Sequence, residues 1–495
     1  MIFDGDLLAE RARLTPDKLA LVAVETGERF TYAELNERAE WAATAVVAAG
    51  VAPGDRYGIL FHNSVDFLAL FFAAAKCGGI VVPLSTRATV HELDQIVRDC
   101  GMSVLFAGSE FKELPGCQVA KLEPYETDSG ATRQPGNQPT RQPGNSEKPY
   151  CLLYTSGTTG KPKGVMIPKR QLWWNGYNTA VNWGLRDDDV SPIYTPLYHA
   201  GGVAAFLIPI FTVGGTIVLH RGFDAVEVWR TIEQEHCTVV LGVPTTLKML
   251  MEAPEFATAD LAHVRWFISG GAPLPHSVIE AYQKRGVGMK QGYGMTEVGV
   301  NCFSMTLDDS RRKAGSIGKP MLFTEVRVVD ETGNEMPAGE IGEMWIRGPH
   351  VSLGYWNNPE ATRAAFDAAG WLHTGDLARH DDEGFFYIAG RRKEMFISGG
   401  VNVYPAEIEA ELVSHPGVAD AAVIPIADEK WGEVAVAFIV GAATEGELSE
   451  YLALRIARYK LPKRYIFVDA LPRTPYGKVE KPTLREMLTR RERNR

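Results

Sequence analysis

Short apolar runs alternate with amphipathic stretches of helical length along most of the chain. Residues 57–61 predict a buried strand, residues 65–76 a mostly apolar helix, and residues 79–83 the next strand. The same order recurs further along, at residues 216–219, 226–235 and 239–242. Strands and helices that alternate at this spacing form parallel sheets with helices on both faces. We therefore expect an α/β fold whose main body consists of doubly wound, mostly parallel sheets.

The length of 495 residues predicts more than one domain. Between residues 324 and 350 the pattern becomes typical of antiparallel strands, with runs at residues 325–329 and 342–347, which predicts a small β-barrel-like subdomain. After Gly390 the chain mixes short helices and strands, so we expect a large domain over residues 1–390 and a small α+β domain over residues 391–495. Residues 126–149 are polar and rich in proline and glycine, which predicts a surface loop.

The overall charge and the cysteines exclude several classes of protein. The formal net charge is −10, whereas binding to nucleic acid needs a concentrated basic surface. The six cysteines form no CxxC pair, which predicts free thiols in a reducing compartment and no structural zinc site. The chain does not open on a basic segment followed by an apolar one, so we expect a cytoplasmic protein.

One uncharged stretch, residues 200–219, is long enough to span a bilayer. Pro209 and the pair Gly214 and Gly215 interrupt it. We therefore expect a core helix followed by a core strand, and no transmembrane segment. Peripheral contact with a membrane stays open, as does the oligomeric state, for which a homodimer is one alternative.

A glycine-rich segment, residues 154–164, follows an apolar strand predicted at residues 151–153. Its glycines allow a tight turn that presents amide groups to an anion, and its hydroxyls and lysines add donors and positive charge. The segment lacks the lysine followed by Ser or Thr that ends a Walker A loop. It predicts a phosphate site of another kind, with contacts from Thr155, Ser156, Gly157, Thr158, Thr159, Gly160 and Lys163.

This segment resembles the signature of the adenylate-forming enzymes. That family includes acyl-CoA synthetases, aryl-CoA ligases, firefly luciferase and the adenylation domains of peptide synthetases. Further motifs follow in the family's order, and the resemblance covers nearly the whole chain. It implies a ligase that uses ATP and Mg²⁺ to convert a small carboxylic acid into an acyl-adenylate, releases pyrophosphate, and transfers the acyl group to coenzyme A with release of AMP.

The resemblance also implies roles for residues of the nucleotide site. Residues 269–274 match the segment that lies along the adenine, and residues 291–297 match the segment whose tyrosine packs on its face. Thr296 is implied as a contact of the α-phosphate and Glu297 as the Mg²⁺ ligand, which suits an ion that prefers one or two carboxylates with phosphate oxygens. The other implied nucleotide contacts are Gly271, Ala272, Pro273, Gln291, Gly292, Tyr293, Gly294, Asp376 and Arg391, the last two at the ribose.

The C-terminal part matches the family's mobile domain. Lys478 matches the catalytic lysine, whose positive charge would bridge the carboxylate and the α-phosphate. Lys393 matches the hinge about which this domain turns between the two steps. The residues implied to contact coenzyme A are Ser398, Gly399, Gly400 and Trp431.

The acyl pocket is implied by the motif around His199, a positioning residue in the family. Peptide-synthetase domains carry an aspartate at the next position, which pairs with the substrate's ammonium, but this chain has Ala200. Because a buried ammonium without a partner is costly, an α-amino acid is not expected. The residues expected around the acid are His199, Ala200, Ala204, Ala205, Gly271, Gly292, Gly294 and Val300.

These residues are small or apolar and suit an aliphatic chain or a flat ring. Residues 313–316, 428–433 and 457–463 are most similar to bacterial fatty-acyl-CoA synthetases, so we expect a medium- to long-chain fatty acid as substrate. An aryl-CoA ligase of the benzoate, cinnamate or succinylbenzoate type stays an alternative. Transfer of the acyl group to a separate carrier protein is another.

Overall fold

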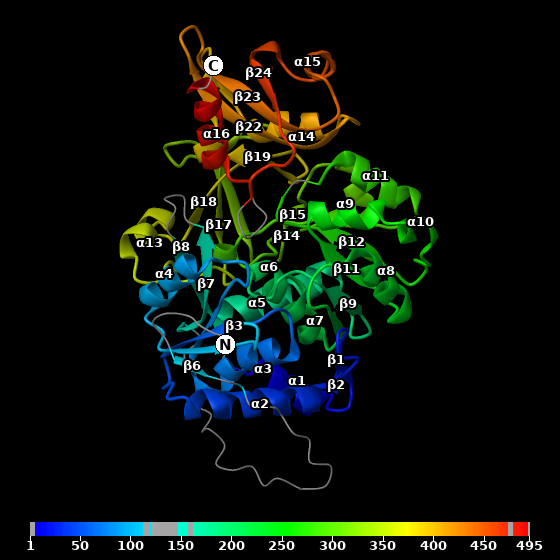
Figure 1. The fold of residues 1–495 in the computed structure, drawn as a ribbon, viewed down its shortest axis with the longest axis vertical. Helices are drawn as coiled ribbons and strands as arrows, with labels where there is room; N and C mark the ends of the chain where they lie inside the picture. The colour runs from blue at the N-terminus through cyan, green and yellow to red at the C-terminus, as the bar shows by residue number, and fades with distance from the viewer. Residues whose placement is uncertain are drawn as a thin grey trace.

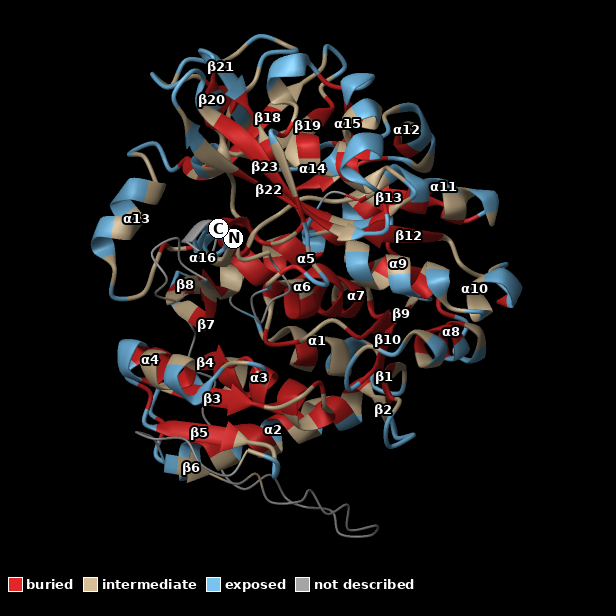
Figure 2. Cartoon of the chain, turned by 45° about the horizontal axis from the view of Figure 1, so that its top comes forward, coloured by how far each residue is buried: buried red, intermediate tan, exposed pale blue. Residues whose placement is uncertain are grey.

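A computed structural model gives the structure of the protein. It describes residues 5–111, 118–120, 122, 147–156, 162–272, 274–473 and 479–493. The predicted α/β fold is confirmed: mostly parallel sheets form the body of the molecule, and a C-terminal unit lies at the top of Figure 1. Figure 2 shows that the sheet strands are largely buried while the outer faces of the helices are exposed. The five cysteines that the structure describes are free and buried.

The first sheet has six strands in the order β6-β5-β3-β4-β7-β8. All neighbours are parallel except β7 and β8, which form an antiparallel pair. Helices α2 and α3 cover one face and α4 covers the other, each with its own apolar cluster. The elements are α2 (Tyr32–Ala48), β3 (Arg56–Leu60), α3 (Val65–Cys77), β4 (Ile80–Pro83), α4 (Val90–Cys100), β5 (Val104–Ala107), β6 (Gln118–Ala120), β7 (Pro149–Ser156) and β8 (Pro162–Pro168).

Two further sheets have the orders β2-β1-β10-β9 and β11-β12-β13. They adjoin at β9 and β11, where the Thr238 amide donates to the Val190 carbonyl over 2.8 Å. Helices α8 to α11 pack on one face, and α5 and α7 lie on the other. The elements are α1 (Leu7–Leu14), β1 (Leu19–Ala23), β2 (Arg29–Thr31), α5 (Lys169–Trp183), β9 (Val190–Ile193), β10 (Thr216–Leu219), α8 (Ala225–Gln234), β11 (Val239–Gly242), α9 (Pro244–Glu252), α10 (Glu255–Thr258), β12 (Trp266–Ser269), α11 (His276–Lys284) and β13 (Met289–Gln291).

The uncharged stretch at residues 200–219 lies in the core, as expected. It forms α6 (Ala200–Gly202), a π-helical turn η1 (Val203–Leu207), α7 (Ile208–Val213) and then β10. The π-helical turn is a difference from the uniform helix that the sequence predicts. No helix in the described part of the chain is long and apolar enough to cross a membrane.

The predicted antiparallel region is a four-stranded meander in the order β16-β17-β18-β19. Its first two strands match the ranges expected from the sequence pattern. A short strand pair and two small helices adjoin it. The elements are η2 (Thr296–Val298), β14 (Phe303–Ser304), α12 (Leu307–Arg312), β15 (Lys319–Pro320), β16 (Glu325–Val329), β17 (Gly342–Arg347), α13 (Pro359–Ala365), β18 (Leu372–His380) and β19 (Phe386–Arg391).

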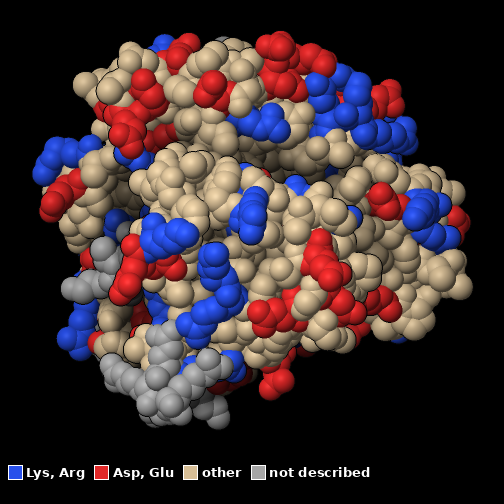
Figure 3. Space-filling view, turned by 90° about the horizontal axis from the view of Figure 1, so that it is seen from above, with Lys and Arg blue, Asp and Glu red and all other residues tan. Residues whose placement is uncertain are grey.

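The C-terminal unit has a five-stranded sheet and apolar clusters of its own, one on each face. Because it buries a separate core, it has the anatomy of a small domain, although the boundary after residue 390 stays a prediction. Seen from above, its basic and acidic side chains are interspersed (Figure 3). The elements are η3 (Arg392–Glu394), β20 (Phe396–Ser398), β21 (Val401–Val403), α14 (Pro405–Val413), β22 (Val418–Asp428), β23 (Gly432–Gly441), α15 (Glu445–Ala453), η4 (Arg458–Lys460), β24 (Arg464–Phe467) and α16 (Lys481–Arg493).

A buried carboxylate joins the amino ends of three strands. The side chain of Asp189, just before β9, is fully buried and contacts Arg265 Nη1 at 2.6 Å. It also accepts a hydrogen bond from the Thr238 hydroxyl at 2.6 Å. Arg265 in turn donates to the Gly184 carbonyl at the end of α5 over 2.7 Å. This group holds β9, β11, β12 and α5 in one arrangement.

We expect Arg265→Met to destabilise the large domain. Removing one partner of a buried ion pair leaves the other charge uncompensated, which costs about 3–5 kcal/mol. The measurement is the free energy of unfolding in urea. The control is Arg311→Met, whose exposed pair with Asp308 is expected to contribute less than about 1 kcal/mol. Equal effects of the two substitutions would contradict this role of Asp189.

Candidate active site

Several predicted nucleotide contacts lie outside the described residues: Gly157, Thr158, Thr159, Gly160, Pro273 and Lys478, together with the side chain of Ser156. Their predicted roles stay predictions. On either side of this segment the strands pair antiparallel, with Thr155 opposite Lys163. The predicted phosphate segment therefore joins two strands of a hairpin, and no helix follows it as in a Walker A site.

The carboxylate of Asp376 on β18 gathers two other predicted site residues. The Tyr293 hydroxyl donates to Asp376 Oδ2 over 2.5 Å, and Arg391 Nε lies 2.7 Å from Asp376 Oδ1. Burial, and then the Asp376 charge, raise the pKa of Tyr293 well above its usual value, so its hydroxyl stays a donor. Burial opposes the charge of Arg391, but Asp376, Tyr293 and the nearby glutamates together outweigh it and raise the pKa of Arg391. The three side chains come from three segments and form one polar group.

Aromatic packing connects this group to the meander. The Tyr293 ring lies 5.6 Å from the Phe303 ring, and Phe303 lies 5.4 Å from Phe386 on β19. The backbone of Phe386 pairs with Gly318 in an isolated bridge. Tyr293 is thus fixed on one side by packing and on the other by its hydrogen bond to Asp376.

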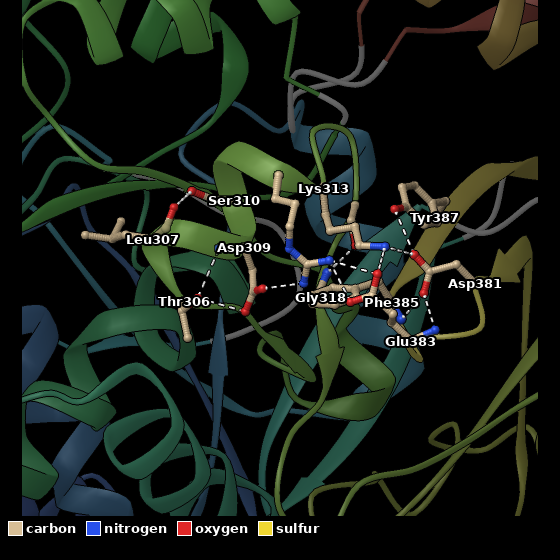
Figure 4. Close-up of polar contacts among 12 residues, drawn as sticks. Thr306, Leu307, Asp309, Ser310, Lys313, Gly318, Asp381, Glu383, Phe385 and Tyr387 are labelled. Atoms are coloured by element: carbon tan, nitrogen blue, oxygen red, sulfur yellow. Dashed lines mark hydrogen bonds and ion pairs between the residues drawn. The ribbon is translucent and has the colours of Figure 1, made fainter.

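A charged network holds the turn between β18 and β19, the strands that carry Asp376 and Arg391 (Figure 4). Lys313 Nζ lies 2.7 Å from Asp381 Oδ2 and 2.6 Å from Glu383 Oε1. Arg312 contacts Glu383 at 2.6 Å. The network connects α12 and Lys313 to the turn of the β18–β19 hairpin. It therefore stabilises the hairpin that carries Asp376 and Arg391.

Glu297 occupies a buried position beside Tyr355. Its Oε1 accepts a hydrogen bond from the Tyr355 hydroxyl over 2.8 Å, and the residue is 6% exposed. The backbone is fixed as well, because Ser352 donates to the Glu297 carbonyl over 2.8 Å and Gln171 Nε2 to the Thr296 carbonyl over 2.8 Å. Burial, and then Glu297, raise the pKa of Tyr355, which keeps the phenol protonated.

Lys163 adds a positive charge near this pair, since its Nζ lies 5.3 Å from the centroid of the Tyr355 ring. Tyr355 was not predicted from the sequence. The available signal was Gly354-Tyr355-Trp356, an aromatic pair after a glycine in a polar stretch. Such a pair does not indicate which carboxylate it will meet.

The residues present fit a magnesium ion better than a metal held wholly by protein. Among the described residues, no group of three or more His, Cys, Asp and Glu side chains could hold a metal. Glu297 offers a single oriented carboxylate. Mg²⁺ commonly binds through one or two carboxylates together with phosphate oxygens of a substrate. The chemistry of this carboxylate fits the predicted role of Glu297 as Mg²⁺ ligand, which stays a prediction.

The predicted acyl residues around His199 lie on α6 and η1. His199 Nδ1 accepts a hydrogen bond from the Gly201 amide over 3.1 Å and so fixes the start of α6. Two buried asparagines bind the π-helical turn: Asn175 Nδ2 donates to the Ala204 carbonyl over 2.6 Å, and Asn301 Nδ2 to the Ala205 carbonyl over 2.9 Å. These bonds connect η1 to α5 and to the segment of Val300.

The predicted glycines differ in what they adjoin. The Gly292 amide donates to the Ser269 carbonyl over 2.8 Å, and a Cβ on Gly292 would lie 3.5 Å from Ile268 and 3.6 Å from Trp183. A Cβ on Gly294 would lie 2.2 Å from the Val300 carbonyl oxygen, so Gly294 packs directly on backbone. Gly271 has φ of +83°, which a residue with a side chain rarely adopts. Ala272, like Gly271, is exposed, and Gln291 Oε1 accepts from the Leu274 amide.

Three buried aromatic rings lie behind Gly292 and η1. The Trp183 ring lies 5.9 Å from Phe206 and 6.0 Å from Trp266, and Phe206 lies 5.9 Å from Trp266. Phe206 belongs to the same π-helical turn as Ala204 and Ala205. The small residues expected around the acid are therefore backed by bulky ones.

The residues expected at coenzyme A form one corner of the C-terminal unit. A Cβ on Gly399 would lie 2.8 Å from the Trp431 ring, and the Gly399 amide donates to the Trp431 carbonyl over 2.8 Å. Ser398 is buried and pairs with Gly432. A Cβ on Gly400 would meet nothing within 4 Å, so this glycine faces open space. Gly399 is needed for close approach to Trp431, whereas Gly400 leaves room.

Lys393 lies in the turn η3, between β19 and the C-terminal unit. Its neighbour Glu394 accepts from Lys481 Nζ at 2.6 Å, and Lys481 also contacts Glu409 at 2.8 Å. The turn is thus tied to α14 and α16, which are both C-terminal elements. The predicted hinge role of Lys393 stays a prediction.

Two family models match the chain. The AMP-binding enzyme family matches residues 8–356, and the C-terminal domain of AMP-binding enzymes matches residues 407–478. Among curated relatives, a feruloyl-CoA synthase of Amycolatopsis is 39% identical, with 97% of this chain and 98% of that protein covered. A long-chain-fatty-acid–CoA ligase of Mycobacterium tuberculosis is 40% identical over the same shares.

The fold agrees with solved structures of such proteins. The o-succinylbenzoate CoA synthetase of Bacillus subtilis, in complex with its acyl-adenylate intermediate, has a TM-score of 0.86 at 32% identity and covers 97% of each chain. ATP-bound MatB of Rhodopseudomonas palustris has a TM-score of 0.88 at 33% identity, with 98% of this chain and 99% of that one covered. The chain therefore belongs to the AMP-binding enzyme family and is an AMP-forming acid–CoA ligase, an enzyme class that uses ATP, Mg²⁺ and coenzyme A.

Proposed function

We propose that the acid this ligase activates is an aryl carboxylic acid with a short side chain. The proposal rests chiefly on one observation: Trp183 and Ile268 lie 3.6 Å and 3.5 Å from the position of a Cβ on Gly292, so a group that contacts Gly292 also adjoins an indole ring. A ring of the acid that lies against Gly292 would adjoin this indole, and aromatic rings gain from contact with each other beyond the area they bury.

The surroundings support the same choice. Phe206 and Trp266 extend the aromatic surface behind Trp183. Two relatives carry names that state aryl substrates, the feruloyl-CoA synthase and an indoleacetate–CoA ligase of Aromatoleum aromaticum that is 36% identical. For this chain the aryl acid is a proposal that these likenesses support.

A medium-chain fatty acid is the second candidate. The apolar turn η1 and the 40% identity to a long-chain-fatty-acid–CoA ligase favour it. Trp183 and Ile268 beside Gly292 count against a long chain in that direction. If the acid is a fatty acid, we therefore expect a medium-chain one and not a long-chain one.

We propose that the polar groups around Asp376 and around Glu297 bind different parts of ATP. Asp376, held by Tyr293 and Arg391, accepts hydrogen bonds from the ribose hydroxyls, while the Tyr293 ring lies on the adenine. Glu297, oriented by Tyr355, holds Mg²⁺, which when bound neutralises phosphate charge. Thr296, Lys163 and the segment after Thr155 contact the phosphates. Lys478 brings the final positive charge for attack by the carboxylate.

For the second step we propose that the C-terminal unit turns about Lys393 and brings the corner of Ser398, Gly399, Gly400 and Trp431 to the acyl group. Gly400 then leaves a path for the thiol of coenzyme A, since nothing lies within 4 Å of its Cβ position. Free coenzyme A, and not a carrier protein, is the acceptor in this proposal.

An acid panel tests the substrate. Acid-dependent pyrophosphate release is expected to be at least about 10-fold faster in kcat/KM with cinnamate than with octanoate or palmitate, a difference of about 1.4 kcal/mol in transition-state binding. α-Amino acids should give no release. A preference for octanoate would move the assignment to the second candidate, and a preference for palmitate would contradict the proposed limit on chain length that Trp183 and Ile268 set beside Gly292.

Removing the Tyr355 hydroxyl tests the metal site. Tyr355→Phe is expected to raise the Mg²⁺ concentration needed for half-maximal adenylation about 10-fold, because a hydrogen bond to a charged group contributes about 1.5–3 kcal/mol. Glu297→Gln should raise it further. The matched control is Tyr387→Phe, which removes a phenol donor from Asp381 away from the proposed metal. An equal shift in the control would place the ion elsewhere.

Half-reaction assays test the two positions of the C-terminal unit. Lys478→Ala is expected to abolish ATP–pyrophosphate exchange while a supplied acyl-adenylate is still converted to the thioester. Lys393→Pro should preserve exchange and stop thioester formation, because proline's fixed φ prevents the hinge change. Proportional loss of both steps in both variants would contradict the alternation.

A further inference from the structure

Lys290 is a buried cation with no polar partner among the described residues. It lies on β13 and is only 7% exposed. Its side chain lies against an aromatic ring, with Nζ 4.7 Å from the centroid of Trp266. Buried lysines normally pair with a carboxylate. The charged group that acts on the pKa of Lys290 is Arg265, a second cation, which is itself paired with Asp189.

The lysine remains able to donate hydrogen bonds. Burial, and then the charge of Arg265, lower the pKa of Lys290 to about 8, so the ammonium form still prevails at neutral pH. The ring of Trp266 stabilises a nearby cation by about 0.5–2 kcal/mol. It is not a conventional hydrogen-bond acceptor, so it leaves the three N–H donors of the Lys290 ammonium without one. An acceptor brought to Nζ would therefore find an available donor.

The register of the sheet places Lys290 on the side where the acid is expected. β12 and β13 run parallel, with Ile268 opposite Lys290. Side chains alternate along a strand, so Lys290 and the Cβ direction of Gly292 share a face, on which Ile268 and Trp266 also lie. Phe267 and Met289 point to the other face, into the cluster formed with α8, α9 and α11.

The Lys290 side chain lies away from the nucleotide residues, toward the amino end of β12. Two residues along a strand separate Lys290 from Gly292, a rise of about 7 Å. Gly292 lies at the carboxyl end of β13, beside the nucleotide residues, and Lys290 reaches back to Trp266 at the amino end of β12. The three rings of Trp183, Phe206 and Trp266 surround this end. An acid whose carboxylate lies near Gly292 would direct its distal end toward this group.

We propose that Lys290 is a specificity-determining residue that donates a hydrogen bond to an acceptor oxygen at the distal end of the acid. The chemistry is shared by a phenolic oxygen on an aryl acid and by a second carboxylate. The inference rests on the proposed function in one respect, since it takes the acid to lie against Gly292 with its distal end toward the ring of Trp183. The proposed acid therefore has a polar distal end, whereas the small and apolar residues alone predict a wholly apolar acid.

Matched pairs of acids test the proposal. One pair is 4-hydroxycinnamate and cinnamate, and the other is dodecanedioate and dodecanoate. Wild-type enzyme is expected to prefer the oxygen-bearing member of at least one pair by about 10-fold or more in kcat/KM, as expected for a hydrogen bond to a charged donor. In Lys290→Met, which keeps the length of the side chain, that ratio should fall to about 1, and Lys290→Arg should keep part of it.

A lysine elsewhere supplies the control. Lys319 Nζ lies 4.6 Å from the ring of Phe385, a similar cation–aromatic contact far from β13, so Lys319→Met should leave both ratios as in wild type. A wild-type ratio near 1 in both pairs overturns the proposal whether or not the variants fold. A ratio that persists in Lys290→Met also overturns it. Preference for the aliphatic pair over the aryl pair would refute the proposed function alone, because the role of Lys290 is measured within each pair.

Discussion

The carboxylate of Asp376 is the point on which the geometry of the nucleotide side depends. It is buried, and its two oxygens are held by a phenol and a guanidinium from other segments. A buried charge is tolerated only when it is paired and hydrogen-bonded, so the positions of β18, β19 and the segment of Tyr293 are coupled. Arg391 is also the last residue before the turn that contains Lys393. The same ion pair therefore connects the proposed ribose site to the turn on the C-terminal side of the predicted domain boundary.

Local patterns were sufficient to predict much of the fold. The strands at residues 216–219, 239–242, 325–329 and 342–347 have the predicted bounds, because runs of β-branched and apolar residues bounded by turns specify strands locally. The antiparallel pairing of β7 and β8 is consistent with a phosphate segment unlike a Walker A loop. The π-helical turn was missed. Its extra residue is stabilised by Asn175 and Asn301, which lie far away in sequence, so no local pattern contains the information.

The site was predicted less completely, for a related reason. Motifs identified Glu297, Tyr293, Asp376 and Arg391, and the structure brings the last three together. It also adds Tyr355, whose role depends on a contact across 58 positions of sequence. Lys290 was overlooked because one lysine in a short strand looks like an edge position facing solvent. Its significance is visible only when burial and the missing counter-charge are known.

The two ends of the same strands carry different parts of the chemistry. At the carboxyl ends of β12 and β13, glycines and backbone groups leave space for a nucleotide and a carboxylate, which every acid of this reaction shares. Toward the amino ends lie the side chains of Trp183, Phe206, Trp266 and Lys290, away from the residues proposed to contact the nucleotide. Gly292 marks the boundary, since any Cβ there would approach Trp183 and Ile268. Under the proposed function, changes at Trp183, Phe206 or Lys290 would alter the acid while Asp376 and Glu297 keep their geometry. Relatives of nearly equal identity carry names with different acids, so the apolar character of the residues near Gly292 alone does not identify the substrate.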